Sequence, residues 1–575
     1  EAAPDARFRL RRYLSRYRRP LGIGFGLVAL DTLLTLAGPL LVRRGIDQGV
    51  TQRSTSALYG ASLAFLAVAL VDWAVTWTYT RQTGRTAERL LYALRIRIFA
   101  HLQRMSVDYY DREMAGRIMT RMTTDVEALS QLLQTGLINA IVSILSFVGV
   151  LGLLAFIDWR LLLAVLSVVP PLLIATWWFR RASSRAYDRA RDRIAAVNAD
   201  LQESLSGVRV AQAYVREERN AQSFRQLGGE YLDARLDAQR LVALYFPFVL
   251  FLSAVADVIV LGVGSRLVAG GTLTAGALIA FILYLDQFFS PIQQLSQVFD
   301  TWQQARASTV RIDELMATPT SVPPPEHPIP VAVSGAIRFE HVHFQYPGAV
   351  DEALRGFDLD VHAGQTVALV GETGAGKSTI VKLVARFHDP TAGRLLIDGV
   401  PLTDIDLGAY RRRLGYVPQE PFLFSGSMRD NIAYGRPSAT DAEVEAAARE
   451  VGAHDVIAAL PGGYRYRVTE RGRSLSSGQR QLVCLARAHL VDPAILLLDE
   501  ATANLDLATE ASVQQAMGVV AAGRTTLLVA HRLQTARGAD CIVVLADGQI
   551  AEIGTHDQLL AHGGSYAALW GVLAV

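Results

Sequence analysis

The first half of the chain alternates between long apolar runs and long polar intervals. A helix needs about 20 mostly apolar residues to cross the hydrocarbon core of a bilayer. The runs of about that length are Leu21–Val42, Leu58–Tyr79, Leu132–Ile157, Leu161–Phe179, Leu244–Gly264 and Leu273–Gln293. The intervals after the second and fourth runs keep a helical repeat and contain few helix breakers, so each is expected to extend its helix beyond the bilayer and return. The pattern predicts a six-helix, all-α transmembrane domain over residues 20–318.

Arginine is concentrated in these two long intervals. The arginines concerned are Arg81, Arg85, Arg89, Arg95, Arg97, Arg104, Arg180, Arg181, Arg185, Arg189, Arg191 and Arg193. Loops rich in basic residues stay on the cytoplasmic side of a membrane, so the helical extensions and both chain ends are expected to be cytoplasmic. Residues 1–19 also mix arginines with apolar residues, which predicts a basic amphipathic elbow helix on an anionic membrane surface rather than a nucleic-acid-binding arm.

Composition supports a membrane protein. Hydrophobic residues make up 51% of the 575 residues and charged residues 19%, and the mean hydropathy is +0.24; these values are unusual for a wholly soluble chain. The formal net charge of +2 gives no overall basicity, so no nucleic-acid partner is expected. The two cysteines, Cys484 and Cys541, have no metal-ligand spacing and are expected to be reduced core thiols.

A proline-rich linker, residues 319–335, separates the membrane half from a domain with a different pattern. From residue 336 apolar side chains recur with a period of two, as at Ile337, Phe339, Val342 and Phe344, which predicts β-strands. Strand, turn and helix follow one another further along. Residues 336–575 are therefore expected to form an α/β domain with a helical subdomain.

One segment of this domain, TVALVGETGAGKSTIVKLV, carries a phosphate-binding pattern. A predicted strand over Thr366–Val370 leads into a glycine-rich turn, Gly371–Gly376, and then into a helix. The form G-x-x-x-x-G-K-S lets backbone N–H groups wrap a phosphate, while Lys377 reaches the terminal phosphates and Ser378 binds Mg²⁺. In this strand and helix context the segment predicts an ATP site rather than a structural glycine turn.

Two carboxylates follow another predicted strand. Ile495–Leu498 is apolar and leads directly into Asp499 and Glu500. At the carboxyl end of a strand in a parallel sheet, one carboxylate can hold Mg²⁺ and the next can polarise a water for attack on a phosphoryl group. Taken alone, the same run also fits a buried strand that ends in a solvated acidic turn.

Small residues also precede a predicted helix, Gln479–His489. Ser476, Ser477 and Gly478 occupy the helix start, where unpaired N–H groups and the helix dipole can receive an anionic phosphate. The alternative is that one of the serines simply caps the helix.

Charged and aromatic residues also occur within the apolar runs. The carboxylates there are Asp31, Asp72, Asp257 and Asp286. An ionised carboxylate is costly inside a bilayer, so each is expected either to face a cavity or to form an interhelical hydrogen bond. Phe281, Tyr284 and Phe288 recur at helical spacing, and packing against neighbouring helices is favoured over contact with cargo. If both sets contact cargo, that cargo is amphipathic or cationic.

Several of these segments together resemble one protein family. LSSGQRQ followed by ILLLDEATANLD is similar to the signature, Walker B and D-loop sequence of ATP-binding cassette (ABC) transporters. The family pattern is LSGGQ, so Ser477 departs from its first glycine, and Asn504 replaces the commoner alanine of the D-loop. The membrane half resembles that of ABC exporters, in which the stretches corresponding to Ser106–Leu129 and Leu205–Phe224 contain coupling helices. The resemblance covers essentially the whole chain.

The resemblance implies a role for each motif residue. Tyr346 would stack on adenine, Gln419 of the Q-loop would touch Mg²⁺ or the attacking water, and His531 would contact the γ-phosphate. The implied catalytic residues are Lys377, Glu500 and His531. The implied ATP-binding residues are Tyr346, Gly371, Glu372, Thr373, Gly374, Ala375, Gly376, Lys377, Ser378, Thr379 and Gln419. The implied metal ligands are Ser378, Gln419 and Asp499, and the signature residues Ser476, Ser477, Gly478 and Gln479 would contact the partner's ATP.

The same resemblance implies an ATP hydrolase that is coupled to transport and uses ATP and Mg²⁺. The chain would be half of an exporter in a bacterial inner (plasma) membrane, where membrane lipids surround it. It would move amphipathic or hydrophobic small molecules, such as drugs or lipids, out of the cytoplasm or inner leaflet by alternating access. A second half-transporter is then the expected partner. The LSSGQRQL and EATANLD forms, with an intact Glu500, favour a heterodimer over a homodimer. An ATP-gated channel, a regulatory membrane subunit and an importer with the same fold remain alternatives.

Overall fold

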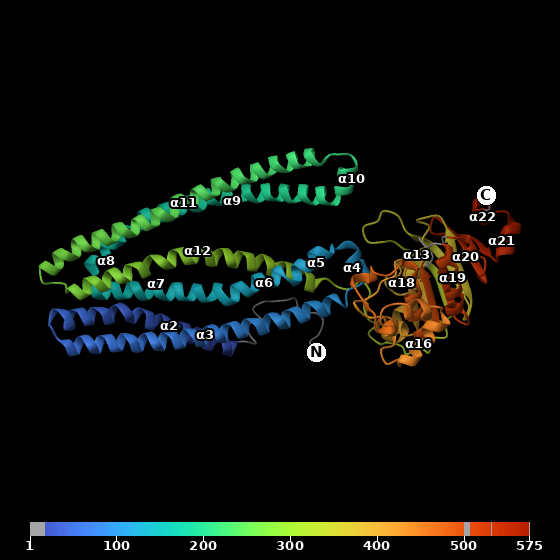
Figure 1. The fold of residues 1–575 in the computed structure, drawn as a ribbon, viewed down its shortest axis with the longest axis horizontal. Helices are drawn as coiled ribbons and strands as arrows, with labels where there is room; N and C mark the ends of the chain where they lie inside the picture. Colours follow the sequence, from blue (N-terminus) through green and yellow to red (C-terminus); the bar gives the residue numbers. More distant parts are fainter. Residues whose placement is uncertain (1–17, 500–506, 531, 574–575) are drawn as a thin grey trace. The chain divides into compact units, whose positions relative to one another are not determined.

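The computed structural model describes residues 18–499, 507–530 and 532–573, and its contacts divide the chain into two compact units (Figure 1). The first unit comprises Glu1–His101 and Gly116–Thr318, and the second comprises Leu102–Ala115 and Pro319–Val575. The short segment Leu102–Ala115 therefore packs with the second unit, although it lies between membrane helices in the sequence.

The first unit is helical throughout its described residues. Its elements are α2 (Arg18–Arg44), η2 (Gly45–Thr51), α3 (Thr55–Leu102), α5 (Ala115–Met122), α6 (Thr124–Gln131), η3 (Leu132–Gly136), α7 (Leu137–Ile157), α8 (Trp159–Leu166), α9 (Val169–Ser206), α10 (Val208–Ala213), α11 (Glu217–Ala269) and α12 (Ala275–Ala317). Among the described residues, five helical segments are long and apolar enough to span a membrane, and Ala275–Pro291 adds a shorter apolar helix. The predicted helical membrane domain is confirmed.

Several helices extend well beyond membrane length, as predicted. α3 has 48 residues and α11 has 53. At about 1.5 Å per residue, each is more than twice as long as the roughly 30 Å hydrocarbon core of a bilayer. α9 and α11 lie side by side, with the short α10 between them in the sequence (Figure 1). The fourth predicted run is interrupted between α8 and α9, because prolines begin α9 and proline fits only the first turn of a helix.

Aromatic side chains of α12 form part of the core of this unit. Phe281, Tyr284 and Phe288 are all buried. The Tyr284 hydroxyl donates a hydrogen bond to the carbonyl of Leu36 in α2, and the Phe288 ring stacks on Phe147 of α7 with centroids 5.2 Å apart. The predicted packing role of these aromatics is confirmed.

A carboxylate from another element caps the start of α12. Asp47 of η2 accepts hydrogen bonds from Thr274 Oγ1 at 2.7 Å and from the Gly276 N–H at 2.9 Å. The backbones approach so closely that a Cβ at Gly276 would lie 2.5 Å from the carbonyl oxygen of Arg43. Glycine at this position and the Asp47 carboxylate therefore hold α2 and α12 together at this end.

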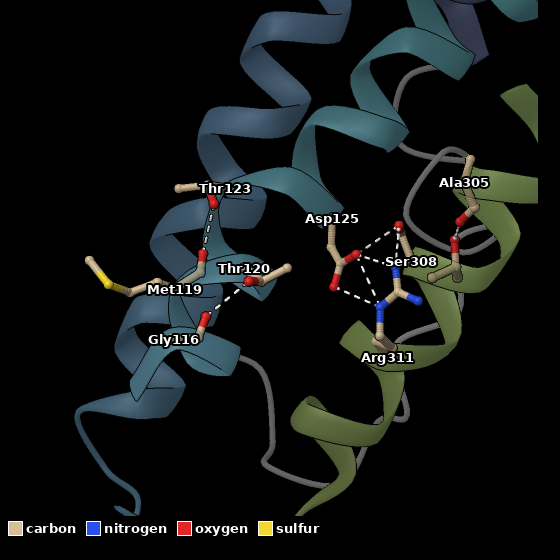
Figure 2. A network of polar contacts seen from close by, with 9 residues as sticks. Gly116, Met119, Thr120, Thr123, Asp125, Ala305, Ser308 and Arg311 are labelled. Atoms are coloured by element: carbon tan, nitrogen blue, oxygen red, sulfur yellow. Dashed lines mark hydrogen bonds and ion pairs between the residues drawn. The ribbon is translucent and has the colours of Figure 1, made fainter. Parts of the chain in front are cut away.

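Figure 2 shows a second polar contact, between α6 and α12. The Asp125 carboxylate is 1% exposed. It accepts hydrogen bonds from Ser308 Oγ at 2.9 Å and from Arg311 Nε at 3.0 Å, and the Arg311 Nη2 donates to Ser308 Oγ at 3.0 Å. Because burial removes water from the carboxylate, these fixed donors replace its hydration.

The second unit is the predicted α/β domain. Its strands are β1 (Ile337–Phe344), β2 (Leu354–Val361), β3 (Thr366–Gly371), β4 (Ala392–Ile397), β5 (Val400–Pro401), β6 (Leu414–Val417), β7 (Gly426–Ser427), β8 (Arg467–Val468), β9 (Ile495–Asp499), β10 (Thr525–Val529), β11 (Cys541–Ala546) and β12 (Gln549–Gly554). Its main helices are α4 (Val107–Arg112), α13 (Lys377–Val384), α14 (Leu407–Arg411), α15 (Met428–Ile432), α16 (Asp441–Glu450), α17 (His454–Ala458), α18 (Ser477–Val491), α19 (Leu507–Ala521), α20 (Leu533–Ala536), α21 (His556–His562) and α22 (Ser565–Leu573).

Two sheets organise this unit. The larger has the strand order β12-β11-β3-β10-β9-β6, and all neighbours in it are parallel except β12 with β11. The smaller has the order β2-β1-β4-β5, and the alternating residues Ile337, Phe339, Val342 and Phe344 of β1 are buried, as their spacing predicts. Cys484 and Cys541 are free thiols, also as predicted, and burial raises the pKa of both.

The Asp125 cluster leads to a stability prediction. Replacing Arg311 with Met should destabilise the protein by about 1–3 kcal/mol, because it leaves a buried carboxylate without its cationic donor. Thermal unfolding of the purified protein in detergent measures this as a lower Tm. Arg225→Met is the matched control, because Arg225 pairs with Glu218 where both side chains are about two-thirds exposed, and such pairs contribute little. Equal losses in the two variants would contradict the assigned role of the cluster.

Candidate functional site

The candidate site lies at the carboxyl edge of the parallel strands. β3 ends at Gly371 and β9 ends at Asp499. β10 pairs with both strands and places Val529 opposite Asp499 on one side and opposite Leu369 on the other. β6 ends beside β9, so Gln419, two residues beyond β6, leaves the sheet at the same edge. Parallel pairing thus brings segments that are distant in the sequence to one edge, where ligands of such sheets bind.

The turn after β3 requires glycine. Gly371, Gly374 and Gly376 have φ values of +149°, +91° and +99°, a region that other residues rarely adopt. A Cβ at Gly371 would lie 2.3 Å from the Leu545 carbonyl oxygen, and a Cβ at Gly376 would lie 2.7 Å from that of Ala353. At Gly374 nothing lies within 4 Å, so the middle of the turn is open.

Lys377 begins α13 and folds back over this turn. Its side chain is buried, and its Nζ donates to the carbonyl oxygens of Gly371 and Glu372, each at 2.7 Å. The exposed residues Glu372, Thr373 and Gly374 form the tip of the turn, and Ala375 packs into the core. A buried ammonium group beside an open turn at a helix start fits the charge of a polyphosphate.

Two oxygen ligands meet beside the turn. Ser378 Oγ in the first turn of α13 donates a hydrogen bond to Asp499 Oδ1 over 3.2 Å, and Asp499 is buried. Hydroxyl and carboxylate oxygens are the ligands that Mg²⁺ prefers. The pair therefore fits a magnesium ion at the position that the sequence predicts.

Tyr346 lies close to the same helix. Its hydroxyl is 3.1 Å from Thr379 Oγ1, its ring packs edge to face on Phe344 with centroids 4.8 Å apart, and the Lys382 ammonium lies 5.4 Å from the ring centroid. The ring is half-buried. An aromatic held beside a phosphate-binding turn is well placed to stack on a base.

The signature residues begin α18. Ser476 caps this helix, because its hydroxyl accepts a hydrogen bond from the Gln479 N–H at 3.2 Å and the Gln479 side chain accepts one from the Ser476 N–H at 2.9 Å. The capping alternative is thus confirmed for Ser476, which remains exposed, while Ser477 starts the helix and Gly478 is buried. α18 packs in a different hydrophobic cluster from α13.

Some predicted residues lie outside the described part of the chain. Glu500, Asn504 and His531 belong to this group, as do residues 1–17 of the predicted elbow helix. Conversely, Lys382 and His388, which lie beside Tyr346, were not singled out from the sequence. The only sequence signal for these two residues is their short distance after Lys377. Spacing alone does not show which side chains contact the Tyr346 ring.

The carboxylates within the apolar runs have different surroundings. Asp31 of α2 accepts a hydrogen bond from the Thr76 hydroxyl of α3, which is an interhelical bond of the kind predicted. Asp72 Oδ1 is buried without a hydrogen-bond partner among the described residues. Asp257 of α11 is half-buried and Asp286 of α12 is exposed, and each is within electrostatic range of the other.

Family models match both units. Residues 21–292 match the ABC transporter transmembrane region, and residues 354–503 match the ABC transporter family. In a solved structure, a bacterial Atm1-family ABC exporter with ATP bound, 97% of this chain superposes on 98% of that chain with a TM-score of 0.78 and 30% sequence identity.

Relatives match over nearly the whole chain. A multidrug efflux ATP-binding/permease protein of Mycobacterium bovis is 47% identical over 98% of this chain, which corresponds to 47% of the relative. The uncharacterized ABC transporter ATP-binding protein YknV of Bacillus subtilis is 36% identical over 98% of this chain and 93% of its own length. A fatty acid ABC transporter ATP-binding/permease protein of Mycobacterium bovis is 36% identical over 91% of this chain. The chain spans about half the length of the multidrug efflux relatives that it matches.

The turn geometry leads to a prediction for the nucleotide-free protein. Gly376→Ala and Gly374→Ala should each lower the Tm, because alanine is strained by about 1–2 kcal/mol at these φ values. Gly376→Ala should lower it further, by an amount equivalent to about 1–3 kcal/mol, since its Cβ also clashes with the backbone. Thermal unfolding without nucleotide compares them. Equal Tm shifts would contradict the close approach at Gly376.

Proposed function

Because the chain belongs to the ABC transporter family, we propose that it is half of an ATP-driven exporter. It moves amphipathic or hydrophobic small molecules, such as drugs or lipids, out of the cytoplasm or the inner leaflet. The observation that carries this proposal is the fusion of long membrane helices to an ABC ATPase unit in which Ser378 and Asp499 meet beside the phosphate-binding turn. Relatives described as multidrug efflux and fatty acid transporters support the cargo class.

The ATPase unit binds ATP through the turn and its flanking residues. Tyr346 stacks on the base, the backbone of Gly371–Thr379 surrounds the phosphates, and Lys377 exchanges its two carbonyl contacts for phosphate oxygens. Ser378, Gln419 and Asp499 hold Mg²⁺. When bound, the metal offsets the negative charge of the phosphates.

Hydrolysis is assigned to residues at the same sheet edge. Glu500, directly after Asp499, accepts a proton from the attacking water, and His531, two residues beyond the end of β10, supports the γ-phosphate. Both are proposals from their place in the sequence, since they lie outside the described residues.

A second unit of the same kind completes the site. The signature residues Ser476–Gln479 begin α18, which packs in a different hydrophobic cluster from α13, the helix after the phosphate-binding turn. We therefore assign the signature to the ATP of a partner in a head-to-tail arrangement. The Mycobacterium bovis multidrug efflux relative, about twice as long as this chain, supports two such units acting together. The intact motif around Glu500 favours a different second unit, a heterodimeric arrangement.

Closure of the two ATPase units drives alternating access in the membrane. The short helices α4 and α10 lie in the two stretches assigned to coupling, and α9 and α11 are long enough to carry motion from outside the bilayer into it. The protein is a multi-pass membrane protein of bacterial type, and we propose a bacterial inner-membrane location with the ATPase unit and both termini in the cytoplasm.

Glu500→Gln tests the catalytic assignment. The variant, assembled with its partner, should still bind ATP, but its turnover should fall by at least about 100-fold because the water loses its base. ATP binding and phosphate release measure the two properties in proteoliposomes. Turnover at the wild-type rate would refute the assignment. Uphill accumulation of cargo, as opposed to passive ATP-gated flux, distinguishes an exporter from a channel.

The carboxylates of α11 and α12 test the cargo proposal. If Asp257 and Asp286 line the path, Asp257→Asn and Asp286→Asn should reduce drug-stimulated ATPase activity and transport of cationic cargo by several-fold, because each loses a negative charge in a low-dielectric path. Basal ATPase activity and transport of a neutral cargo serve as controls. Unchanged stimulation and transport in both variants would remove these residues from the path.

A further inference from the structure

His388 packs against Tyr346, the residue proposed to stack on the base, and lies within electrostatic range of the segment Leu102–Ala115. It follows α13 and is 4% exposed. Its ring packs edge to face on Tyr346, with centroids 5.5 Å apart, and against Phe344 at 5.3 Å. Its charge is also within range of Asp108 and Asp111 of α4. The buried imidazole therefore contacts Tyr346 and interacts electrostatically with the carboxylates of α4.

α4 is firmly attached at this position. Asp108, 5% exposed, accepts hydrogen bonds from Ser321 Oγ at 2.6 Å, from Arg112 Nη2 at 2.8 Å and from Ser106. Burial opposes ionisation of Asp108, but these donors and the Arg112 charge outweigh it, so the pKa of Asp108 is below its ordinary value. Asp108 is therefore a stable negative charge in the electrostatic environment of His388.

The surroundings of His388 favour the neutral ring at neutral pH. Its Nε2 is buried without a hydrogen-bond partner among the described residues. Burial, followed by the nearby Lys382 ammonium, lowers the pKa of His388, whereas Asp108, Asp111 and Asp389 act in the opposite direction. The Tyr346 phenol ring contacts the imidazole directly. The buried Arg386 guanidinium, two residues earlier in the chain, is bonded to Asp389 at 3.0 Å and to the Pro323 carbonyl at 3.2 Å.

We propose that His388 is a positioning residue for Tyr346 and that its protonation weakens ATP binding, which makes the nucleotide site sensitive to acidification. The proposal rests on the function proposed above, because it takes Tyr346 as the residue that stacks on adenine. Under this proposal, the ATPase unit binds a proton at His388 as well as ATP, and the two ligands affect each other's binding.

The direction follows from the charges around the ring. A protonated imidazole is repelled by Lys382, which lies over Tyr346, and attracted by the carboxylates Asp108 and Asp111. Protonation therefore draws the ring toward α4 and removes the edge that fixes the orientation of Tyr346. Since ATP binding then favours neutral His388, linkage requires that proton binding and ATP binding oppose each other.

The test compares ATP with inorganic triphosphate on the full-length chain. Triphosphate lacks a base and does not engage Tyr346, so the ratio of the two affinities reports the contribution of the base. The same ratio measured in His388→Phe gives the part of its pH dependence that comes from titration of the phosphates. In the Glu500→Gln background, we expect the affinity for MgATP relative to Mg-triphosphate to fall about twofold to fivefold between about pH 7.5 and about pH 5.5. His388→Phe keeps an aromatic ring but cannot be protonated, and its affinity ratio should change with pH much less than that of the parent.

Two further variants separate protonation from packing. Asp111→Asn removes one exposed carboxylate and should move the midpoint of the pH response to lower pH, with the affinity at high pH unchanged, an effect that a purely structural role of His388 would not produce. His362→Gln, at an exposed histidine of the same domain, is the matched control and should behave as wild type. Asp111→Asn also keeps the proposal testable if His388→Phe does not fold.

The outcomes distinguish the two levels of the proposal. An equal fall of the affinity ratio in the parent and in His388→Phe, or a midpoint that does not move in Asp111→Asn, overturns the role of His388 and leaves the proposed function intact. Failure of the Glu500→Gln chain to bind either ligand at any pH contradicts the proposed function itself.

Discussion

The nucleotide site depends on the parallel pairing of β10 with both β3 and β9. This pairing places the end of β3 and the end of β9 one strand apart, so the turn after Gly371 and the carboxylate of Asp499 face the same space. α13 starts at that point and directs Lys377 and Ser378 back toward it. A polyphosphate needs many donors fixed in advance, because mobile groups would lose conformational entropy on binding. The sheet supplies this preorganisation, and the glycines supply the close backbone approach.

The helical unit meets a different constraint. Apolar packing among α2, α7, α11 and α12 forms its core, but packing of similar side chains does not by itself set how far one helix slides along another. Directional polar contacts do so, and two of them join carboxylates to α12. Asp47 caps α12 from η2, and Asp125 is bound by Ser308 and Arg311. Because each contact is short and directional, α12 is held in register with α2 at one place and with α6 at the other.

The segment Leu102–Ala115 belongs to the α/β unit, although helices of the first unit flank it in the sequence. In that unit, Asp108 is bound to Ser321 at the start of the linker. Arg386 reaches the same linker through the Pro323 carbonyl. The side chains around His388 therefore connect Tyr346, the linker and α4 within one unit. A change in charge at such a point acts on all three, because the interior around it offers little water to screen the charge.

Much of this architecture was readable from the sequence because it rests on local periodicity and on motifs with a fixed backbone requirement. Apolar run length determined the membrane helices, and the glycine pattern with its Lys and Ser determined the phosphate-binding turn. The cap by Ser476 follows from serine chemistry in the same way, whereas the break between α8 and α9 was not predicted, although prolines mark it in the sequence. The tertiary structure alone decided that Asp125 meets Arg311, that Asp47 caps α12 and that His388 packs on Tyr346. The residues in each of these contacts are distant in the sequence and meet only when helices and strands pack. No local sequence pattern shows which polar side chains are buried next to one another.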